Sequence, residues 1–91
     1  MSVRKQAVDF VTYILSQVCR EEDSYKIEVV EDDKGTLLLI KVKGEDMGRI
    51  IGKSGKNISA LRTLISNIAA REDARLAVKV IEIEAEDFDN A

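Results

Sequence analysis

GRIIGKSGKNI, residues 48–58, is the stretch that decides the fold of this chain. It combines three glycines with three basic side chains, and its Gly-Lys-Ser suggests a nucleotide-binding phosphate loop. Such a loop requires the pattern G-x-x-x-x-G-K-[ST]. If Gly52–Ser54 closed that pattern, Met47 would stand in place of the first glycine, and if Gly55–Lys56 closed it, Ile50 would. The stretch is therefore not a nucleotide loop, and its glycines need another explanation.

The length and composition of the chain limit what surrounds this stretch. Its 91 residues are 45% hydrophobic and 34% charged, which predicts one small domain with a single modest core. There is one cysteine, Cys19, and no histidine. A disulfide within the chain, histidine-based catalysis and a typical zinc site therefore have no residues to use. We expect no catalytic residues, no metal site, no cofactor and no enzymatic activity.

The apolar segments are short. The run Leu37–Ile40 is far below the length of a membrane span, and residues near the N-terminus lack the apolar block of a signal peptide. We therefore expect a cytoplasmic protein without a membrane partner.

Charge is unevenly distributed along the sequence. The formal net charge is −3, with acidic residues concentrated at 21–23, at 31–33 and from 82 to 89. Basic side chains instead bracket the glycine stretch: Arg49, Lys53, Lys56 and Arg62. An acidic chain with a local basic patch remains compatible with a nucleic-acid partner, because the local field matters more than the sum.

Before the glycine stretch, the pattern predicts one helix and a hairpin. From Val3 to Cys19 apolar residues recur at steps of three and four, as on one stripe of an amphipathic helix that ends near residues 21–23. Two strands follow, at about 25–29 and 37–42, joined by a turn at Asp32–Gly35. The second strand is apolar on both faces, which is typical of a central strand.

After the hairpin, the pattern predicts two helices and a strand. A short helix covers about 45–51 and is interrupted at Gly52 and Gly55. A longer helix turns five apolar residues inward: Ile58, Leu61, Leu64, Ile65 and Ile68. A polar connection at 71–75 leads to a last strand at 77–84. We expect one domain over residues 1–85, helices on one face of a three-stranded sheet, and a flexible acidic tail over 86–91.

Two glycines between consecutive helices have a specific physical use. The amides that begin the second helix lack partners within the helix and lie at the positive end of its dipole, so they can receive a phosphate oxygen. Glycine lets another backbone approach closely. Lys53 and Lys56 add positive charge at the same place. Such a loop suits a chain of phosphodiesters passing over it.

Residues 50–58, IIGKSGKNI, resemble the I-I-G-x-x-G-x-x-I signature of the KH domain. The longer stretch MGRIIGKSGKNISALRTLI is similar to small bacterial single-KH-domain proteins of the KhpA type, and the element order over about residues 3–84 is that of a type II KH domain. The resemblance implies an α+β fold of order αββααβ with a three-stranded mixed sheet. It implies the strand order first, second, third, with the second and third parallel.

The resemblance also implies a function. KH domains bind about four single-stranded nucleotides across the glycine loop and an adjoining groove. We therefore expect an RNA-binding protein that acts as an RNA chaperone or post-transcriptional regulator. The family further implies a homodimer, or a heterodimer with a second KH protein of the Jag type.

Family roles carry over residue by residue. Contacts to the RNA backbone are expected from the loop residues Gly52, Lys53, Ser54 and Gly55, and phosphate contacts at its edges from Arg49, Lys56 and Arg62. The groove that receives the bases is expected to be formed or supported by Ile50, Ile51, Ile58 and Leu61.

Other interpretations of the same residues stay open at this point. The glycine pair can be a plain turn, the isoleucines can belong to the core, and Arg62 can be a solvated charge. Cys19 on the apolar stripe fits a buried structural thiol better than a reactive one. The KH fold can also serve mainly as a scaffold or dimerisation module, since either Leu37 and Leu39 or Leu38 and Ile40 must point away from the helices.

Overall fold

The computed structural model describes residues 2–19 and 24–84, and its element order is the predicted one. The elements are α1 (Val3–Val18), β1 (Tyr25–Asp32), β2 (Gly35–Lys43), α2 (Gly44–Ile51), the 3-10 turn η2 (Lys53–Gly55), α3 (Lys56–Arg71) and β3 (Leu76–Ile83). The αββααβ prediction is thus confirmed. Residues 21–23 and the acidic tail expected at 86–91 lie outside the described residues.

The three strands form one mixed sheet in the order β1-β2-β3. β1 pairs antiparallel with β2, and β2 pairs parallel with β3, as the family resemblance implied. The β1–β2 turn is fixed by Asp32, whose Oδ1 accepts hydrogen bonds from the amides of Lys34 at 2.7 Å and Gly35 at 3.1 Å. This Asp side chain supplies the turn chemistry that the sequence predicted.

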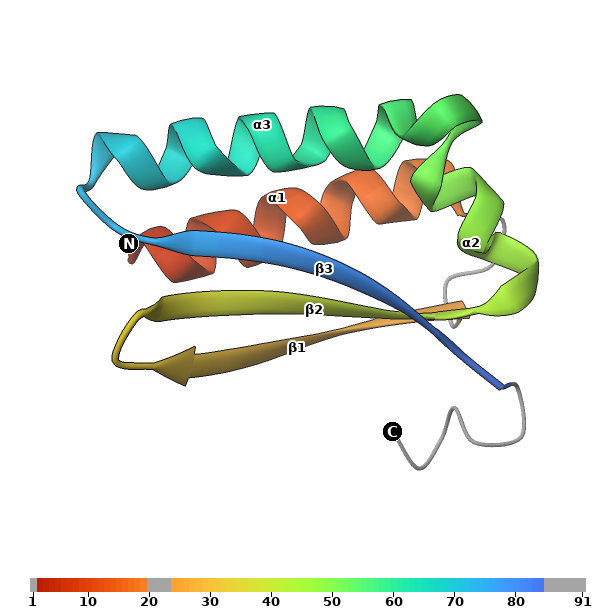
Figure 1. The fold of residues 1–91 in the computed structure, drawn as a ribbon, viewed down its shortest axis with the longest axis horizontal. Coiled ribbons are helices and arrows are strands. Elements are labelled where there is room, and N and C mark those ends of the chain that lie inside the picture. The colour runs from red at the N-terminus through yellow and green to blue at the C-terminus, as the bar shows by residue number, and fades with distance from the viewer. Residues whose placement is uncertain (1, 20–23, 85–91) are drawn as a thin grey trace.

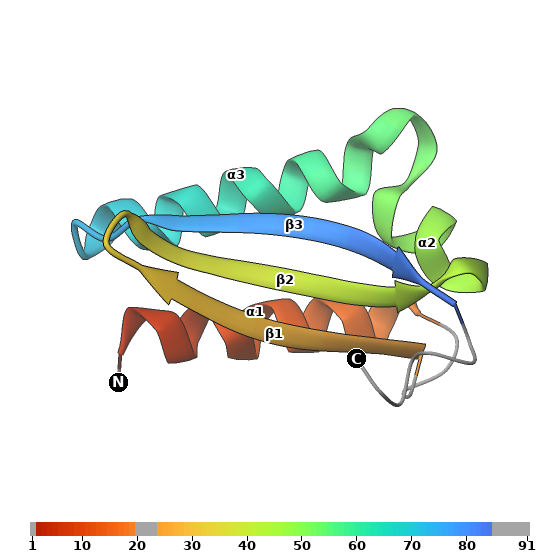
Figure 2. The same cartoon turned by 60° about the horizontal axis from the view of Figure 1, so that its bottom comes forward.

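The helices cover one face of the sheet and leave the other without a covering helix (Figures 1 and 2). On β2, Leu38, Ile40 and Val42 are fully buried beneath the helices. Leu37 and Leu39 alternate with them and are half-buried on the opposite, outer face. The pair that points away from the helices is therefore Leu37 and Leu39.

The helices contribute regular apolar rows to the core. α1 buries Ala7, Val11 and Leu15, spaced four residues apart. α3 buries Ile58, Leu61, Ile65 and Ala69. The expectation that Leu64 points inward is wrong, because 47% of that residue is exposed. Leu64 lies one residue before Ile65, about 100° around the helix, and so falls at the edge of the buried stripe.

A buried carboxylate joins the start of α2 to the chain before β1. Asp46 is 1% exposed and Ser24 is fully buried, and the Ser24 hydroxyl donates a hydrogen bond to Asp46 Oδ2. Arg49, one turn further along α2, donates to Asp46 Oδ1 at 2.6 Å and to the Glu45 carbonyl at 3.1 Å. The charge of Asp46 is thus compensated inside the fold, which explains why a carboxylate is tolerated there.

Cys19 lies next to this network. Burial raises the pKa of its thiol, and the negative charge of Asp46 raises that pKa further. The thiol therefore stays protonated at neutral pH and is a poor nucleophile. This supports the interpretation of Cys19 as a structural residue.

Among the helices of the described residues, none is long and apolar enough to cross a bilayer.

We predict that Asp46→Ala destabilises the fold by about 2–3 kcal/mol. The substitution leaves a buried hydroxyl without its acceptor and strips Arg49 of its counter-charge, although Arg49 is partly exposed and can regain water. In a domain of this size, the melting temperature should fall by roughly 10–20 °C. Thermal unfolding followed by circular dichroism measures it.

Glu45→Ala is the matched control, because Glu45 is the exposed neighbour of Asp46 in the same helical turn. Its effect should stay within about 0.5 kcal/mol. Equal melting temperatures for the two variants would show that the buried network does not support α2.

Candidate nucleic-acid interface

The loop between α2 and α3 takes a left-handed path. α2 ends at Gly52, whose φ is 79° and whose amide donates to the Gly48 carbonyl at 2.8 Å. Ser54 follows with φ 56° and ψ 25°, and Gly55 with φ 75° and ψ 16°. Three of four successive residues thus have positive φ, a conformation that non-glycine residues rarely adopt. The loop is a sharp reversal between the two helices.

The two glycines of the loop are required for different reasons. A Cβ atom on Gly52 would lie 2.7 Å from Cγ and 2.9 Å from the backbone nitrogen of Asn57, so no side chain fits. A Cβ on Gly55 would meet only Ile58 Cγ2, at 4.0 Å. Gly55 is therefore needed for its backbone angle, and it leaves open space above the first turn of α3.

Asn57 holds the two helices together across the loop. Its side-chain Nδ2 donates a hydrogen bond to the Arg49 carbonyl at 2.8 Å, linking the first turn of α3 to the last turn of α2. No role was predicted for Asn57 from the sequence. The available signal was its position at a helix start beside two glycines, where Asn side chains often bond to nearby backbone groups.

The exposed charge of the loop comes from Lys53 and Lys56. Both side chains are exposed, and neither forms a hydrogen bond or ion pair with another residue in the described part of the chain. The first turn of α3 contains no acidic residue. The Lys56 amide donates to the Lys53 carbonyl, and the positive end of the helix dipole adds positive potential at the same place. The loop therefore presents an uncompensated positive surface that suits an anion.

Arg49 is only partly available to an anion. Its guanidinium binds the buried carboxylate of Asp46, and 40% of its side chain is exposed. Asp46 is also one of two acids in the first turn of α2, where negative charge suits the helix dipole, and no prediction from the sequence included its pair with Arg49. The i,i+3 spacing between the two residues was the signal that would have indicated it.

Arg62 lies about 9 Å further along α3 than Lys56, given the rise of 1.5 Å per residue. Its Nε donates to the Val78 carbonyl at 3.2 Å and so bridges α3 to β3. This contact uses one of the five guanidinium N–H groups. Arg62 is therefore not a purely solvated charge. Its remaining N–H donors lie near β3, the strand at the edge of the sheet.

The four apolar residues predicted for the groove do not lie in one environment. Ile50, Ile58 and Leu61 are at most 7% exposed and belong to the hydrophobic core. Ile51 is half-buried at the end of α2, directly before the loop. The structure thus places three of the four in the core beneath the loop and leaves Ile51 accessible. A base-contacting role for these residues stays a prediction.

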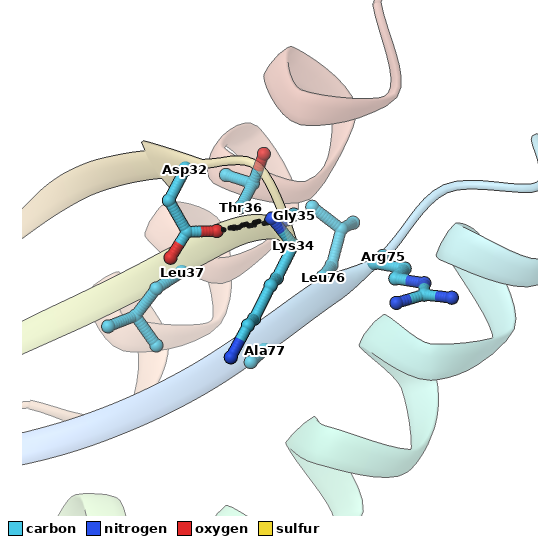
Figure 3. Close-up of a pocket in the computed structure, with 8 residues that line it drawn as sticks. All are labelled: Asp32, Lys34, Gly35, Thr36, Leu37, Arg75, Leu76 and Ala77. Atoms are coloured by element: carbon cyan, nitrogen blue, oxygen red, sulfur yellow. Dashed lines mark hydrogen bonds between the residues drawn. The ribbon is translucent and has the colours of Figure 1, made fainter.

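The described residues form two notable surface hollows, one far from the loop and one that borders it. The larger, about 350 Å³, lies at the β1–β2 turn, where Lys34 and Arg75 flank it and Leu37, Leu76 and Ala77 contribute to its wall (Figure 3). A second, about 180 Å³, lies between α1 and α3, and its lining includes Phe10, Ile14 and Leu64. Ile50 and Asn57 reach the wall of this second hollow. The charged loop itself is a convex turn.

Comparisons with known proteins give consistent matches. Residues 8–80 match the family described as KhpA/KhpB, KH domain. The RNA-binding protein KhpA of Borreliella burgdorferi is 31% identical over 75 residues, which are 82% of this chain and 92% of that protein. KhpA of Chlamydia pneumoniae is 30% identical over 74 residues, 81% of this chain and 95% of that protein. KhpA of Clostridium acetobutylicum is 37% identical over 59 residues, 65% and 79% of the two chains.

The matched region contains both helices of the crossover, the glycine loop and most of the sheet. The fold, the left-handed loop and the sequence matches agree, and the chain belongs to the KhpA/KhpB family of KH domains.

Proposed function

We propose that this protein binds single-stranded RNA and holds the RNA backbone over the loop Gly52–Gly55. The observation that carries the proposal is the pair Lys53 and Lys56, exposed on a left-handed turn at the positive end of α3. A turn that served only to reverse the chain would not need two uncompensated charges. The relatives in three bacteria are named RNA-binding proteins, which supports the same ligand.

The loop suits a passing phosphodiester chain rather than an isolated phosphate. Gly55 leaves the first turn of α3 bare, so a nucleic-acid backbone can come close to its amides. Lys53 and Lys56 are both exposed at this loop and provide charge without a fixed geometry. The remaining N–H donors of Arg62 and the exposed part of the Arg49 side chain extend this positive surface beyond the loop.

Recognition of bases is expected to be loose. KH domains read unstacked bases beside the loop. Here Ile51 is the accessible apolar residue at that place, while aromatic side chains that stack on bases are absent from residues 44–62. Modest affinity with little sequence preference follows. Such binding fits an RNA chaperone or a post-transcriptional regulator in the cytoplasm, without a catalytic step.

A second function, as a protein-interaction module, is favoured by the surface between α1 and α3. There Leu64 is 47% exposed and lines the hollow together with Phe10 and Ile14. We propose that this surface pairs with a second copy or with a second KH protein of the Jag type. It lies on the α1 side of α3, whereas Arg62 reaches toward β3. Its wall meets the loop at Asn57, so the part around Leu64, about two turns further along α3, is where a partner can bind beside RNA.

The outer face of the sheet is less suitable for a symmetric contact. It carries Leu37 and Leu39, but also Lys26, Lys41 and Lys43 at its other end. A two-fold contact whose axis passed near these lysines would bring them close to their own copies. Like charges at close range oppose such pairing.

The RNA assignment predicts that Lys53→Asp with Ser54→Asp abolishes RNA binding and leaves the fold intact. Two carboxylates would then face the phosphates. Ser54 is exposed with left-handed backbone angles, which Asp tolerates better than most residues. Fluorescence anisotropy with a labelled single-stranded RNA measures the affinity, and circular dichroism checks the fold.

A matched control is Ser2→Asp with Lys34→Asp, which changes the net charge equally. Ser2 caps α1 through its hydroxyl, a role that Asp performs equally well, and Lys34 lies in the exposed β1–β2 turn. The control should bind RNA nearly as the original chain does. An unchanged affinity in the folded loop variant would refute the loop assignment.

For the partner surface, we predict that Leu64→Glu weakens self-association at least roughly fivefold. The substitution removes apolar area worth about 1 kcal/mol and adds a charge that must be desolvated. Sedimentation equilibrium over a concentration series measures the dimer. Ser66→Glu, on the opposite side of the same helix, should have little effect. A strictly monomeric original chain at high micromolar concentration would leave only the heterodimer.

A further inference from the structure

α2 ends at the loop with carbonyl groups that the helix itself cannot satisfy, because the last four carbonyls of a helix lack partners within it. The Gly48 carbonyl accepts a hydrogen bond from the Gly52 amide at 2.8 Å. The next carbonyl, that of Arg49, accepts one from Asn57 Nδ2 at 2.8 Å. A side chain of α3 thus caps the end of α2 across the base of the loop.

The same side chain also fits against Gly52. A Cβ atom placed on Gly52 would lie 2.7 Å from Cγ and 2.9 Å from Nδ2 of Asn57. The carboxamide of Asn57 therefore occupies the space that a side chain at residue 52 would need. One planar group holds the Arg49 carbonyl through its N–H and packs against the glycine at which α2 ends.

Arg49 is itself held from the core. Its guanidinium donates to Asp46 Oδ1 at 2.6 Å, and Asp46 accepts a hydrogen bond from the hydroxyl of the fully buried Ser24. A continuous series of contacts therefore runs from Ser24 through Asp46 and Arg49 to Asn57 at the start of α3. The carbonyl that Asn57 binds belongs to a residue whose side chain is already anchored.

The backbone of the loop needs such support. Ser54 has a φ of 56° although it is not glycine. Residues in this conformation are strained, and they persist where the surrounding structure holds them, often at ligand sites. The Gly55 amide donates to the Gly52 carbonyl at 3.0 Å, and this bond joins loop residues only to one another. The bond from Asn57 to Arg49 instead joins the two helices that flank the loop.

We propose that Asn57 is a positioning residue for RNA binding, an inference that rests on the proposed function of the loop. Its hydrogen bond to the Arg49 carbonyl keeps the loop in the left-handed path that presents Lys53 and Lys56. Without the bond, a smaller fraction of the molecules holds this path. The apparent affinity for RNA falls in proportion to that fraction. Asn57 therefore acts through the loop and does not itself have to touch RNA.

The test compares the full chain with its Asn57→Ala variant by fluorescence anisotropy, using a single-stranded RNA of about four nucleotides. Loss of one hydrogen bond of ordinary strength should weaken RNA binding about fivefold. The contact is exposed, so water can replace the lost donor at the Arg49 carbonyl, and the melting temperature should change little. Asn67→Ala is the matched control, because Asn67 is also exposed on α3, about 15 Å further along. It should bind RNA as the original chain does.

Amide hydrogen exchange without RNA separates positioning from a general loss of stability. The Gly52 and Gly55 amides are hydrogen-bonded at the loop, and both should exchange faster in the Asn57→Ala variant. Amides of the central strand β2 open only with the whole fold, so their exchange should stay as in the original chain. A residue that merely stabilised the domain would change both sets together.

An isosteric variant tests the donor itself. Asn57→Asp keeps the shape of the side chain but turns an oxygen without a proton toward the Arg49 carbonyl. Ser59→Asp adds the same charge two residues later, at an exposed position of the same helix, and leaves the Asn57 bond in place. We expect Asn57→Asp to bind RNA at least about fivefold more weakly than Ser59→Asp. Equal affinities would mean that charge alone explains the loss, which would refute the role of the donor.

Other outcomes distinguish this inference from the function on which it rests. If the original chain does not bind the RNA, the proposed function fails and this inference fails with it. If the original chain binds and Asn57→Ala binds equally well, only the role of Asn57 is refuted. Asn57 also lines the hollow between α1 and α3. A loss that disappears when Leu64→Glu is present in both chains would therefore assign the effect to the partner surface and overturn the proposal.

Discussion

The parallel pairing of β2 and β3 is the constraint on which the rest of the structure depends. Parallel neighbours cannot be joined by a tight turn, so the chain must leave the end of β2 and return to the start of β3 by a crossover. Here the crossover consists of two helices on one face of the sheet. The chain changes direction between them at the loop Gly52–Gly55. The candidate interface is thus the corner of the crossover, fixed by Gly52 against Asn57 and by the Asn57 bond to the Arg49 carbonyl.

Much of this could be predicted from the sequence. The apolar periods and the spaced glycines predicted the helix order, the hairpin turn and the loop position, and the resemblance to KH domains implied the sheet order. Sequence reasoning failed where a side chain's role depends on a partner brought from elsewhere. From the sequence Asp46 resembles a surface acid, whereas in the structure it accepts a hydrogen bond from the Ser24 hydroxyl. Asn57 resembles a loop residue, whereas its side chain donates to the Arg49 carbonyl. The prediction for Leu64 failed for another reason. Apolar character alone does not show whether a residue at the edge of a helix's apolar stripe is covered by its neighbours.

The formal net charge of −3 hides an uneven distribution of charge over the surface. Lys53 and Lys56 remain uncompensated within the described residues, Arg49 is largely balanced by Asp46, and Arg62 ties α3 to β3. The apolar surface between α1 and α3 is the one that we propose for a protein partner.

The most direct test of the central claim is a titration of the labelled protein with a single-stranded RNA of about four nucleotides, the length that a KH loop clamps. Backbone amide NMR reports which residues the RNA approaches. The account predicts that the signals of Lys53, Ser54, Gly55, Lys56 and Asn57 move first and furthest, with smaller changes at Ile51 and Arg62. Changes confined to the outer face of the sheet, or to the surface between α1 and α3, with the loop signals unmoved, would contradict it.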